Sequence, residues 1–253
     1  MTHYYKGISF TLQTLKDLED RKVASECLNT IFSGPSFVIP KRYGSVDPIN
    51  LKVDKNNLDR IVELWMGNTN DSGYKKGLLV LEFCRDGDFM INWAKGEFKG
   101  LSTPKFHSVS GGIPFSRIKD TVKLEKYIDL IIGLVKIVNP VFGMIQNNLT
   151  EDWDRPFDLT IRLPEIPWGI ILGEPLVELI GKEQLLTAPF HRVFELSSGH
   201  IMGQLTDSLL DPSLPENKRV LVREWLGADY FMEGKRRLTS YKKSNIPCFD
   251  TSF

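Results

Sequence analysis

Apolar residues recur at three- and four-residue steps in several stretches of the chain, which is the spacing of an amphipathic helix. The longest stretch runs from Val122 to Val138 and stops at Asn139-Pro140. A proline removes an amide donor and disfavours helical geometry in the residue before it, so a helix is expected to end there. The same spacing predicts further helices at Asp17–Phe32, Asn56–Trp65, Pro175–Ile180, Lys182–Leu186 and Glu216–Leu226.

Runs rich in β-branched and aromatic residues lie between these helices and predict strands. Between Gly77 and Trp93, "GLLVLEFC" and "FMINW" flank "RDGD", and an Asp-Gly pair between two such runs predicts a hairpin. The segments "KFHSVSGGI" and "VFGMIQ" predict two more strands, and "HRVFEL" with "HIMGQL" around "SSG" predicts a second hairpin. Because helices and strands do not alternate strictly, we expect an α+β fold of antiparallel sheets with packed helices, not a doubly wound parallel sheet.

The elements divide into two groups that contain the same kinds of structure. We predict an N-terminal α+β half at 1–148, a connecting segment at 149–166 and a C-terminal α+β half at 167–253. The region "NNLTEDWDRPFDLTIRLPEIP" is polar, acidic and contains proline, as expected of an exposed connection. Whether the halves resemble each other, and whether they form one domain, stays open.

The composition is that of an ordinary globular protein and excludes several classes. The chain has 253 residues, of which 42% are hydrophobic and 25% charged, so neither disorder nor a disulfide scaffold fits. With 32 basic and 32 acidic residues the net charge is zero, which argues against attachment to nucleic acid by bulk charge. Three separated cysteines, Cys27, Cys84 and Cys248, cannot all pair and favour a reducing compartment.

The sequence carries no sign of export or membrane insertion. The N-terminal residues alternate polar and apolar side chains, unlike a signal peptide. The most apolar run, "YIDLIIGLVKIV", contains Asp129 and Lys136 and is shorter than the roughly 20 apolar residues that span a bilayer. We therefore expect a cytoplasmic protein that does not bind membranes.

A cluster of glycines precedes the second half of the chain and invites comparison with phosphate-binding loops. Gly169, Gly173 and Gly181 do not have the G-x-G-x-x-G spacing of a dinucleotide site. A phosphate loop would need Ser or Thr after its lysine, but Lys182 is followed by Glu183. We interpret these glycines as a strand-to-helix turn and a helix end, and we predict no cofactor.

The residue types that support metal binding or nucleophilic catalysis lack the required spacing. The run from Asn68 to Gly73 resembles the start of a calcium loop, but Leu79 stands where the closing Glu should be. Ser198 and His200 flank a predicted hairpin turn, where Ser and Gly serve backbone geometry. No zinc motif joins the cysteines to the histidines, which are His3, His107, His191 and His200. We predict no catalytic and no metal-binding residue, unless histidines meet carboxylates or a cysteine in space.

Two clusters of charge are candidate contacts for a partner. In "TEDWDRPFD", an acidic segment that surrounds Trp153 and Phe157, the candidate partner-binding residues are Glu151, Asp152, Trp153, Asp154 and Asp158. Aromatic residues ringed by acids are typical of an anchor for a basic partner, although the same aromatics could pack back onto the core. The segment "EGKRRLTSYKK" is basic, and it fits either a solvated tail or a minor contact with nucleic acid or an acidic partner.

Several sequence motifs together resemble a bacterial family. "PKRYGSVDPI", "NPVFGMI", "PWGIILGEPLVELIGKEQLLTAP" and "GQLTD" occur in this order between about Lys41 and Leu226. The order is similar to that in a widespread group of poorly characterised proteins that overlaps the immunity proteins encoded beside polymorphic toxins, including those of contact-dependent and type VI secretion systems. The resemblance covers most of the chain, and its motifs are turns and packing residues.

The resemblance implies a cytoplasmic, non-enzymatic α+β protein that binds a cognate toxin and blocks its active site or substrate surface. If the toxin is a basic nuclease, the acidic segment around Trp153 is the expected contact, and a homo-oligomer stays open. Direct binding of nucleic acid is not expected. An alternative is a recognition or scaffold subunit of another bacterial conflict system, such as phage defence, and an enzyme of unknown type is a third.

Overall fold

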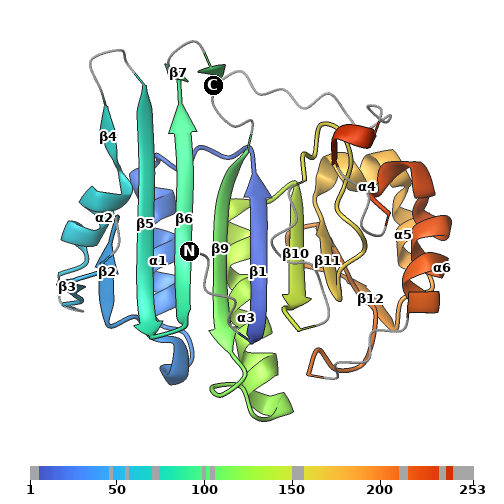
Figure 1. Ribbon diagram of the computed structural model, residues 1–253, viewed down its shortest axis with the longest axis horizontal. Coiled ribbons are helices and arrows are strands. Elements are labelled where there is room, and N and C mark those ends of the chain that lie inside the picture. Colours follow the sequence, from blue (N-terminus) through green and yellow to red (C-terminus); the bar gives the residue numbers. More distant parts are fainter. Residues whose placement is uncertain are drawn as a thin grey trace. The chain divides into compact units, whose positions relative to one another are not determined.

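The computed structural model of the chain describes residues 6–45, 48–54, 57–69, 74–98, 101–102, 106–149, 157–210, 216–233 and 238–241. Its contacts group into two compact units, which we call unit 1, Met1–Pro140, and unit 2, Val141–Asp250. Each unit contains antiparallel strands and packed helices, so the predicted α+β class is confirmed (Figure 1). Within the described ranges no helix is long and apolar enough to cross a membrane.

The sheet of unit 1 is antiparallel throughout. Its strands lie in the order β1-β9-β6-β5-β2-β3, and β4 also pairs with β5. Their bounds are β1 Gly7–Thr14, β9 His107–Pro114, β6 Gly87–Lys95, β5 Lys75–Cys84, β2 Arg42–Gly44, β3 Leu51–Lys52 and β4 Asn68–Thr69. A separate two-stranded ribbon joins β7, Glu97–Phe98, to β8, Leu101–Ser102. The sequentially distant β1 and β9 are joined along eight residue pairs, from Gly7–Pro114 to Thr14–His107.

The helices of unit 1 have local start and stop signals. They are α1, Arg21–Phe32, α2, Asp59–Trp65, and α3, Thr121–Val138, with a short 3-10 turn at Ser36–Val38. The Asp20 and Asp120 side chains accept hydrogen bonds from the first-turn amides of α1 and α3, which satisfies otherwise unpaired donors. Asn139 ends α3 in the left-handed conformation, at φ 47°.

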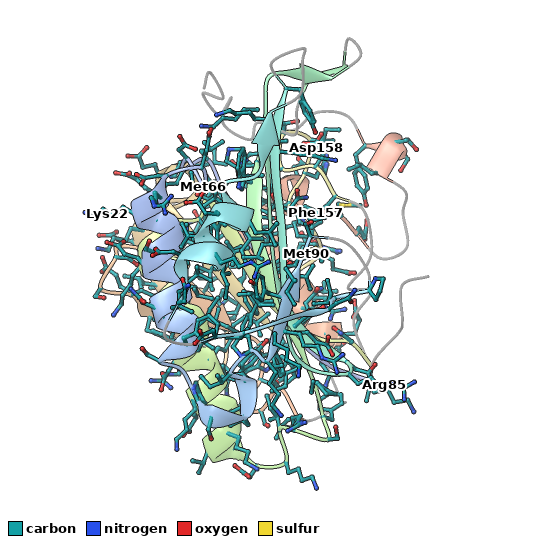
Figure 2. All side chains as sticks on the ribbon, turned by 90° about the vertical axis from the view of Figure 1, so that its left-hand side faces the viewer. Lys22, Met66, Arg85, Met90, Phe157 and Asp158 are labelled. Carbon is teal, nitrogen blue, oxygen red and sulfur yellow. The ribbon has the colours of Figure 1, made fainter. Side chains whose placement is uncertain are left out.

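One face of the unit 1 sheet packs against α1 and α3, which Figure 1 shows behind the strands. Side chains alternate across a strand, and the residues that face the helices are buried. On β1, β5 and β6 these are Ile8, Phe10, Leu12, Leu79, Leu81, Phe83, Phe89, Ile91 and Trp93. Figure 2 shows Lys22 of α1 on one side of these strands and Met90 of β6 on the other. The core of unit 1 therefore lies on the helix side of its sheet.

Unit 2 has short strands in the order β12-β13-β11-β10, also antiparallel. Their bounds are β10 Phe142–Asn147, β11 Gly169–Leu172, β12 Arg192–Glu195 and β13 Ile201–Gln204. The helices are α4 Glu174–Ile180, α5 Lys182–Leu186 and α6 Glu216–Leu226, with 3-10 turns at Ala228–Tyr230 and Leu238–Ser240. Every residue of β10, β11 and β13 is buried, so these strands are covered on both faces.

Several local predictions differ from the structure in position, among them the start of α2, which is Asp59. The β5–β6 hairpin is confirmed, but its turn is Arg85–Asp86, because Cys84 pairs with Gly87 after a register shift in β5. Helix α1 begins at Arg21, so the residues from Asp17 to Asp20 precede it. Helix α4 begins at Glu174, one position before the expected start at Pro175. The proline then lies in the first turn, where a missing amide donor is tolerated.

The region between the two predicted halves is not a wholly exposed connection. Phe142 begins a strand of unit 2, and its ring lies 6.1 Å from that of Phe157, edge to face. Farther along, Leu159, Leu163 and Ile166 are buried. The expectation of an exposed connection is therefore wrong for this stretch, because an apolar residue every three or four positions within the polar sequence packs into the core. The predicted boundaries at 149 and 166 stay predictions.

Candidate functional site

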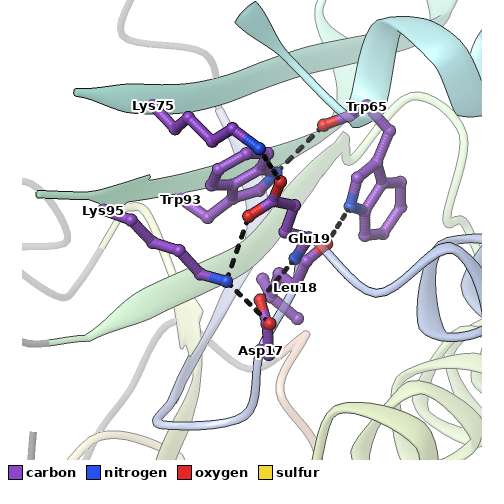
Figure 3. A network of polar contacts seen from close by, with 7 residues as sticks. All are labelled: Asp17, Leu18, Glu19, Trp65, Lys75, Trp93 and Lys95. Atoms are coloured by element: carbon purple, nitrogen blue, oxygen red, sulfur yellow. Dashed lines mark hydrogen bonds and ion pairs between the residues drawn. The ribbon is translucent and has the colours of Figure 1, made fainter. Parts of the chain in front are cut away.

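Four charged side chains meet where the strands of unit 1 end, and we call them the charged cluster: Asp17, Glu19, Lys75 and Lys95. The Lys75 ammonium lies 2.6 Å from a Glu19 carboxylate oxygen. The Lys95 ammonium lies 2.7 Å from Asp17 and 3.0 Å from the second oxygen of Glu19 (Figure 3). The lysines begin β5 and end β6, and both acids belong to the segment between β1 and α1. The cluster therefore ties that segment to two strands.

Two tryptophans hold the same segment through hydrogen bonds. The indole Nε1 of Trp65 donates to the Leu18 carbonyl oxygen at 2.6 Å. The indole Nε1 of Trp93 donates in turn to the Trp65 carbonyl oxygen at 3.0 Å, as Figure 3 shows. Both tryptophans are fully buried, and a buried indole N–H needs such an acceptor. The backbone of Leu18, between the two acids of the cluster, is thus held on both sides.

Ion pairing sets the protonation of the charged cluster. The hydrogen bond from Lys75 is the main cause of the lowered pKa of Glu19. Burial opposes ionisation of Asp17, but hydrogen bonds from Lys95 and from the Glu19 amide prevail and lower its pKa. For Lys95, burial is likewise outweighed by the two carboxylates, and its pKa is raised. These shifts favour the charged forms of Asp17, Glu19 and Lys95. Each member of the cluster is engaged by an opposite charge, as in a structural ion-pair network.

The histidines lie in three different settings. His107 is buried at the start of β9, where burial lowers its pKa and the nearby Asp17 carboxylate opposes that shift. His191 Nε2 lies 3.4 Å from the exposed Asp207 carboxylate. His200 Nδ1 lies 2.9 Å from the hydroxyl of Ser198, inside the β12–β13 turn. Among the residues that the structure describes, no three metal-ligating side chains gather.

Two of the three cysteines are described, and both are free thiols. Burial raises the pKa of Cys27, in the core of α1, to about 12. Burial also raises the pKa of Cys84, at the end of β5, although Arg117 opposes the shift. A thiol with a raised pKa is a poor nucleophile at neutral pH. Cys248 lies outside the described residues.

The predicted acidic segment is only partly described. Glu151, Asp152, Trp153 and Asp154 lie outside the described residues, as do most residues of the basic segment near the C-terminus. Asp158 is half-buried, and its carboxylate accepts hydrogen bonds from the amide and hydroxyl of Thr160, at 2.8 and 2.7 Å. This carboxylate is engaged in a local turn, so its structural role is plain and its role toward a partner stays a prediction.

The residues around Asp158 connect this turn to the C-terminal part of unit 2. The backbones of Asp158 and Arg162 pair in an isolated antiparallel β-bridge. The Arg162 guanidinium donates a hydrogen bond to the Asp229 carbonyl oxygen. The same guanidinium lies 5.0 Å from the centre of the Tyr241 ring, a cation–π contact. Tyr241 belongs to the predicted basic segment, and its hydroxyl accepts from the Glu233 amide at 2.6 Å. Arg162 therefore connects Asp158 of the acidic segment to Tyr241 of the basic segment.

Sequence reasoning missed the face of the unit 1 sheet that is turned away from its helices. We call this the open face, and its side chains come from alternate positions of β1, β5, β6 and β9. One row across these strands consists of Val80, Met90, Ser110 and Thr11, and none of these four residues is buried. The signal was present, because "GLLVLEFC" and "GDFMINW" alternate with a period of two. Without the register, however, the alternation does not say which side chains are neighbours.

A second exposed feature lies on α6 of unit 2. Leu221 and Trp225 are 60% and 48% exposed and are four residues apart, so they share one side of the helix. The Trp225 indole donates to the Gln184 carbonyl oxygen at 3.0 Å, and the Gln184 side chain donates back to the Trp225 carbonyl oxygen at 2.6 Å. These bonds hold the tryptophan against α5.

Comparison with known proteins identifies a solved structure whose fold is similar over most of the chain. No family model matches the sequence, and no curated protein does. In the solved structures, the chain is similar to the Pseudomonas aeruginosa T6SS protein PA0821. The TM-score is 0.52 at 13% sequence identity, and the similarity covers 87% of this chain and 75% of that one. At this identity the likeness is one of fold.

Proposed function

We propose that the chain is a non-enzymatic immunity protein that binds and neutralises a cognate bacterial toxin. The observation that carries the proposal is the similarity in fold to a T6SS protein over 87% of the chain. Type VI secretion systems deliver toxins between bacteria, and the motif order of the sequence independently resembles immunity proteins of such systems. The two lines of support come from different properties, since one uses backbone geometry and the other uses residues.

The chemistry of the described residues is compatible with this role. The charged cluster is neutralised internally, and the two described thiols have raised pKa values. An inhibitor needs a stable scaffold and a complementary surface, and steering by opposite charge speeds capture of its target. The acidic segment Glu151–Asp158 remains our predicted contact if the toxin is basic.

Co-expression with the protein encoded by the adjacent gene tests the proposal. We expect that the neighbouring product is toxic alone, that this chain relieves the toxicity, and that the two proteins co-purify. A neighbour that is toxic but is neither bound nor relieved would contradict the proposal.

A triple alanine variant of Asp152, Trp153 and Asp154 tests the acidic segment within the same experiment. The matched control replaces Val122, Glu125 and Asp129 by alanine, because this set likewise combines one apolar residue with two acids, and its three members are exposed on α3. We expect weaker binding from the first variant only. Equal binding by the parent and both variants would remove the acidic segment from the contact and leave the proposed function in place.

A further inference from the structure

The open face of unit 1 has an arrangement of side chains that the packing of unit 1 does not require. In one row across the strands, Val80, Met90, Ser110 and Thr11 are neighbours by register. Met90 is 38% exposed, and Figure 2 shows it pointing away from the helices. The row is apolar on β5 and β6 and hydroxyl-bearing on β9 and β1. Such a mixture with few charges is typical of the centre of a protein interface.

The adjacent row brings two acids together at one end of the open face. Glu82 of β5 lies directly opposite Asp88 of β6, and Gly112 and Ser9 continue the row. Side chains in directly opposed positions have Cβ atoms about 5 Å apart, and like charges there repel each other. Arg42 of β2 is the register neighbour of Glu82 on the other side. Asp88 thus has an acid beside it on β5 and a glycine on β9.

The Asp88 carboxylate is left without compensation by the described residues. No hydrogen bond or ion pair joins it to any side chain or amide in the described part of unit 1. It is also half-buried rather than fully hydrated. Burial raises the pKa of Asp88 to about 6, and the charge of Glu82 adds to the rise. The free protein therefore carries, at one end of the open face, a carboxylate whose charged form is disfavoured.

We propose that the open face is the docking surface for a basic protein partner, with a lysine or arginine of that partner placed between the carboxylates of Glu82 and Asp88. The proposal rests on the proposed function, in which the partner is the toxin, and adds the surface and the charge that recognise it. Charge complementarity carries it, because Arg42 lies opposite Glu82 alone, and Asp88 has no counterion among the described residues and accepts a cation from outside. An apolar side chain of the partner lies against Met90.

This arrangement gives the two acids a role in binding, since they do not stabilise the fold of unit 1. A cation between them removes their mutual repulsion, and exclusion of water by the docked partner strengthens the attraction. The gain is made only in the complex. Stability given up in the free protein is thus recovered on binding.

The test uses a double variant, Glu82→Gln with Asp88→Asn, and a control, Glu125→Gln with Asp129→Asn. The control removes the same charge from exposed positions on α3, on the helix side of unit 1. The probe is the toxin encoded by the adjacent gene, purified in an inactive form, and its dissociation constant is measured by calorimetry. We expect the double variant to bind roughly 10- to 100-fold more weakly, and the control to stay within about twofold of the parent.

Thermal unfolding of the free proteins separates loss of contact from loss of fold. The double variant should melt at or above the temperature of the parent, because it removes a repulsion. Weaker binding together with unchanged or higher stability supports the docking surface. A second variant, Met90→Lys, places a like charge beside the partner's cation and should also weaken binding.

Each remaining outcome decides between the two proposals. If the parent binds the toxin and relieves its toxicity, but the double variant binds equally well, the docking surface is wrong and the proposed function stands. If the parent neither binds nor protects, both are wrong. If sedimentation shows that the parent is a dimer and the double variant a monomer with unchanged toxin binding, a second copy occupies the open face and the docking proposal is overturned.

Discussion

Replacement of Asp88 by asparagine is expected to stabilise the free protein, and the structure sets the size of the gain. The pKa of this carboxyl is raised from an ordinary 3.8 to about 6, first by burial and then by the charge of Glu82. One pKa unit corresponds to about 1.4 kcal/mol, so the ionised form costs the fold at most about 3 kcal/mol at neutral pH. Because the side chain is only half-buried, water screens part of that cost, and we expect Asp88→Asn to gain about 1–2 kcal/mol.

The sign of the effect gives the prediction a pH dependence. The folded state binds the Asp88 proton more tightly than the unfolded chain does, so the parent gains stability as the pH falls from about 6 to about 4. Asparagine does not titrate. The advantage of Asp88→Asn should therefore be complete above about pH 6 and absent below about pH 4.

The assay is urea unfolding of the parent and the variant, followed by tryptophan fluorescence, well above and well below this window. Asp129→Asn, at an exposed position of α3, is the control and should change the free energy of unfolding by less than about 0.5 kcal/mol at either pH. A loss of stability in Asp88→Asn at neutral pH would refute the reasoning. A gain that persists unchanged at low pH would refute it as well, because a gain from removed charge must vanish when the parent carboxyl is protonated.

Substitutions at four further positions test the packing, the end of α3 and the charged cluster by the same unfolding assay. Gly77→Ala should cost about 3 kcal/mol, since a Cβ there would overlap the Trp93 indole, whereas Gly199→Ala meets no atom within 4 Å and should cost only about 1 kcal/mol for its positive φ. Asn139→Ala should cost about 1 kcal/mol and Asn139→Gly almost nothing, because the residue that ends α3 has φ 47°. Lys95→Met should lose about 1 kcal/mol at low salt and less at high salt, and a loss independent of salt would assign it to packing instead.

The elements that sequence reasoning placed well are those with local signals. Helix α3 was predicted to within one residue at its start, because apolar periodicity and the Asn139-Pro140 stop lie in the segment itself. The start of α1 was placed too early. Asp17 and Leu18 continue the helical spacing, but the Asp17 side chain binds Lys95 of β6 and the Leu18 carbonyl binds the Trp65 indole. Tertiary contacts thus overrode the local preference.

The candidate surfaces show the same division between local and long-range information. Sequence reasoning identified the acidic segment, because its charges are adjacent along the chain, but of its five candidate residues only Asp158 is described. It did not find the pair of Glu82 and Asp88, although both are outward-facing positions of predicted strands. Their opposition depends on the register shift in β5 at the hairpin, and such a shift has no clear signature in the residues.

The sequence by itself determined the α+β class, most of the helices and strands, and the absence of the recognised spacings for phosphate loops and zinc sites. These follow from hydrophobic periodicity, turn residues and motif spacing, which act over a few residues. Only the tertiary structure decided which side chains meet, such as Glu19 with Lys75, or Glu82 with Asp88. The physical reason is that strand register and packing bring together groups from separate segments, and a single-residue change in register turns each side chain to the opposite face.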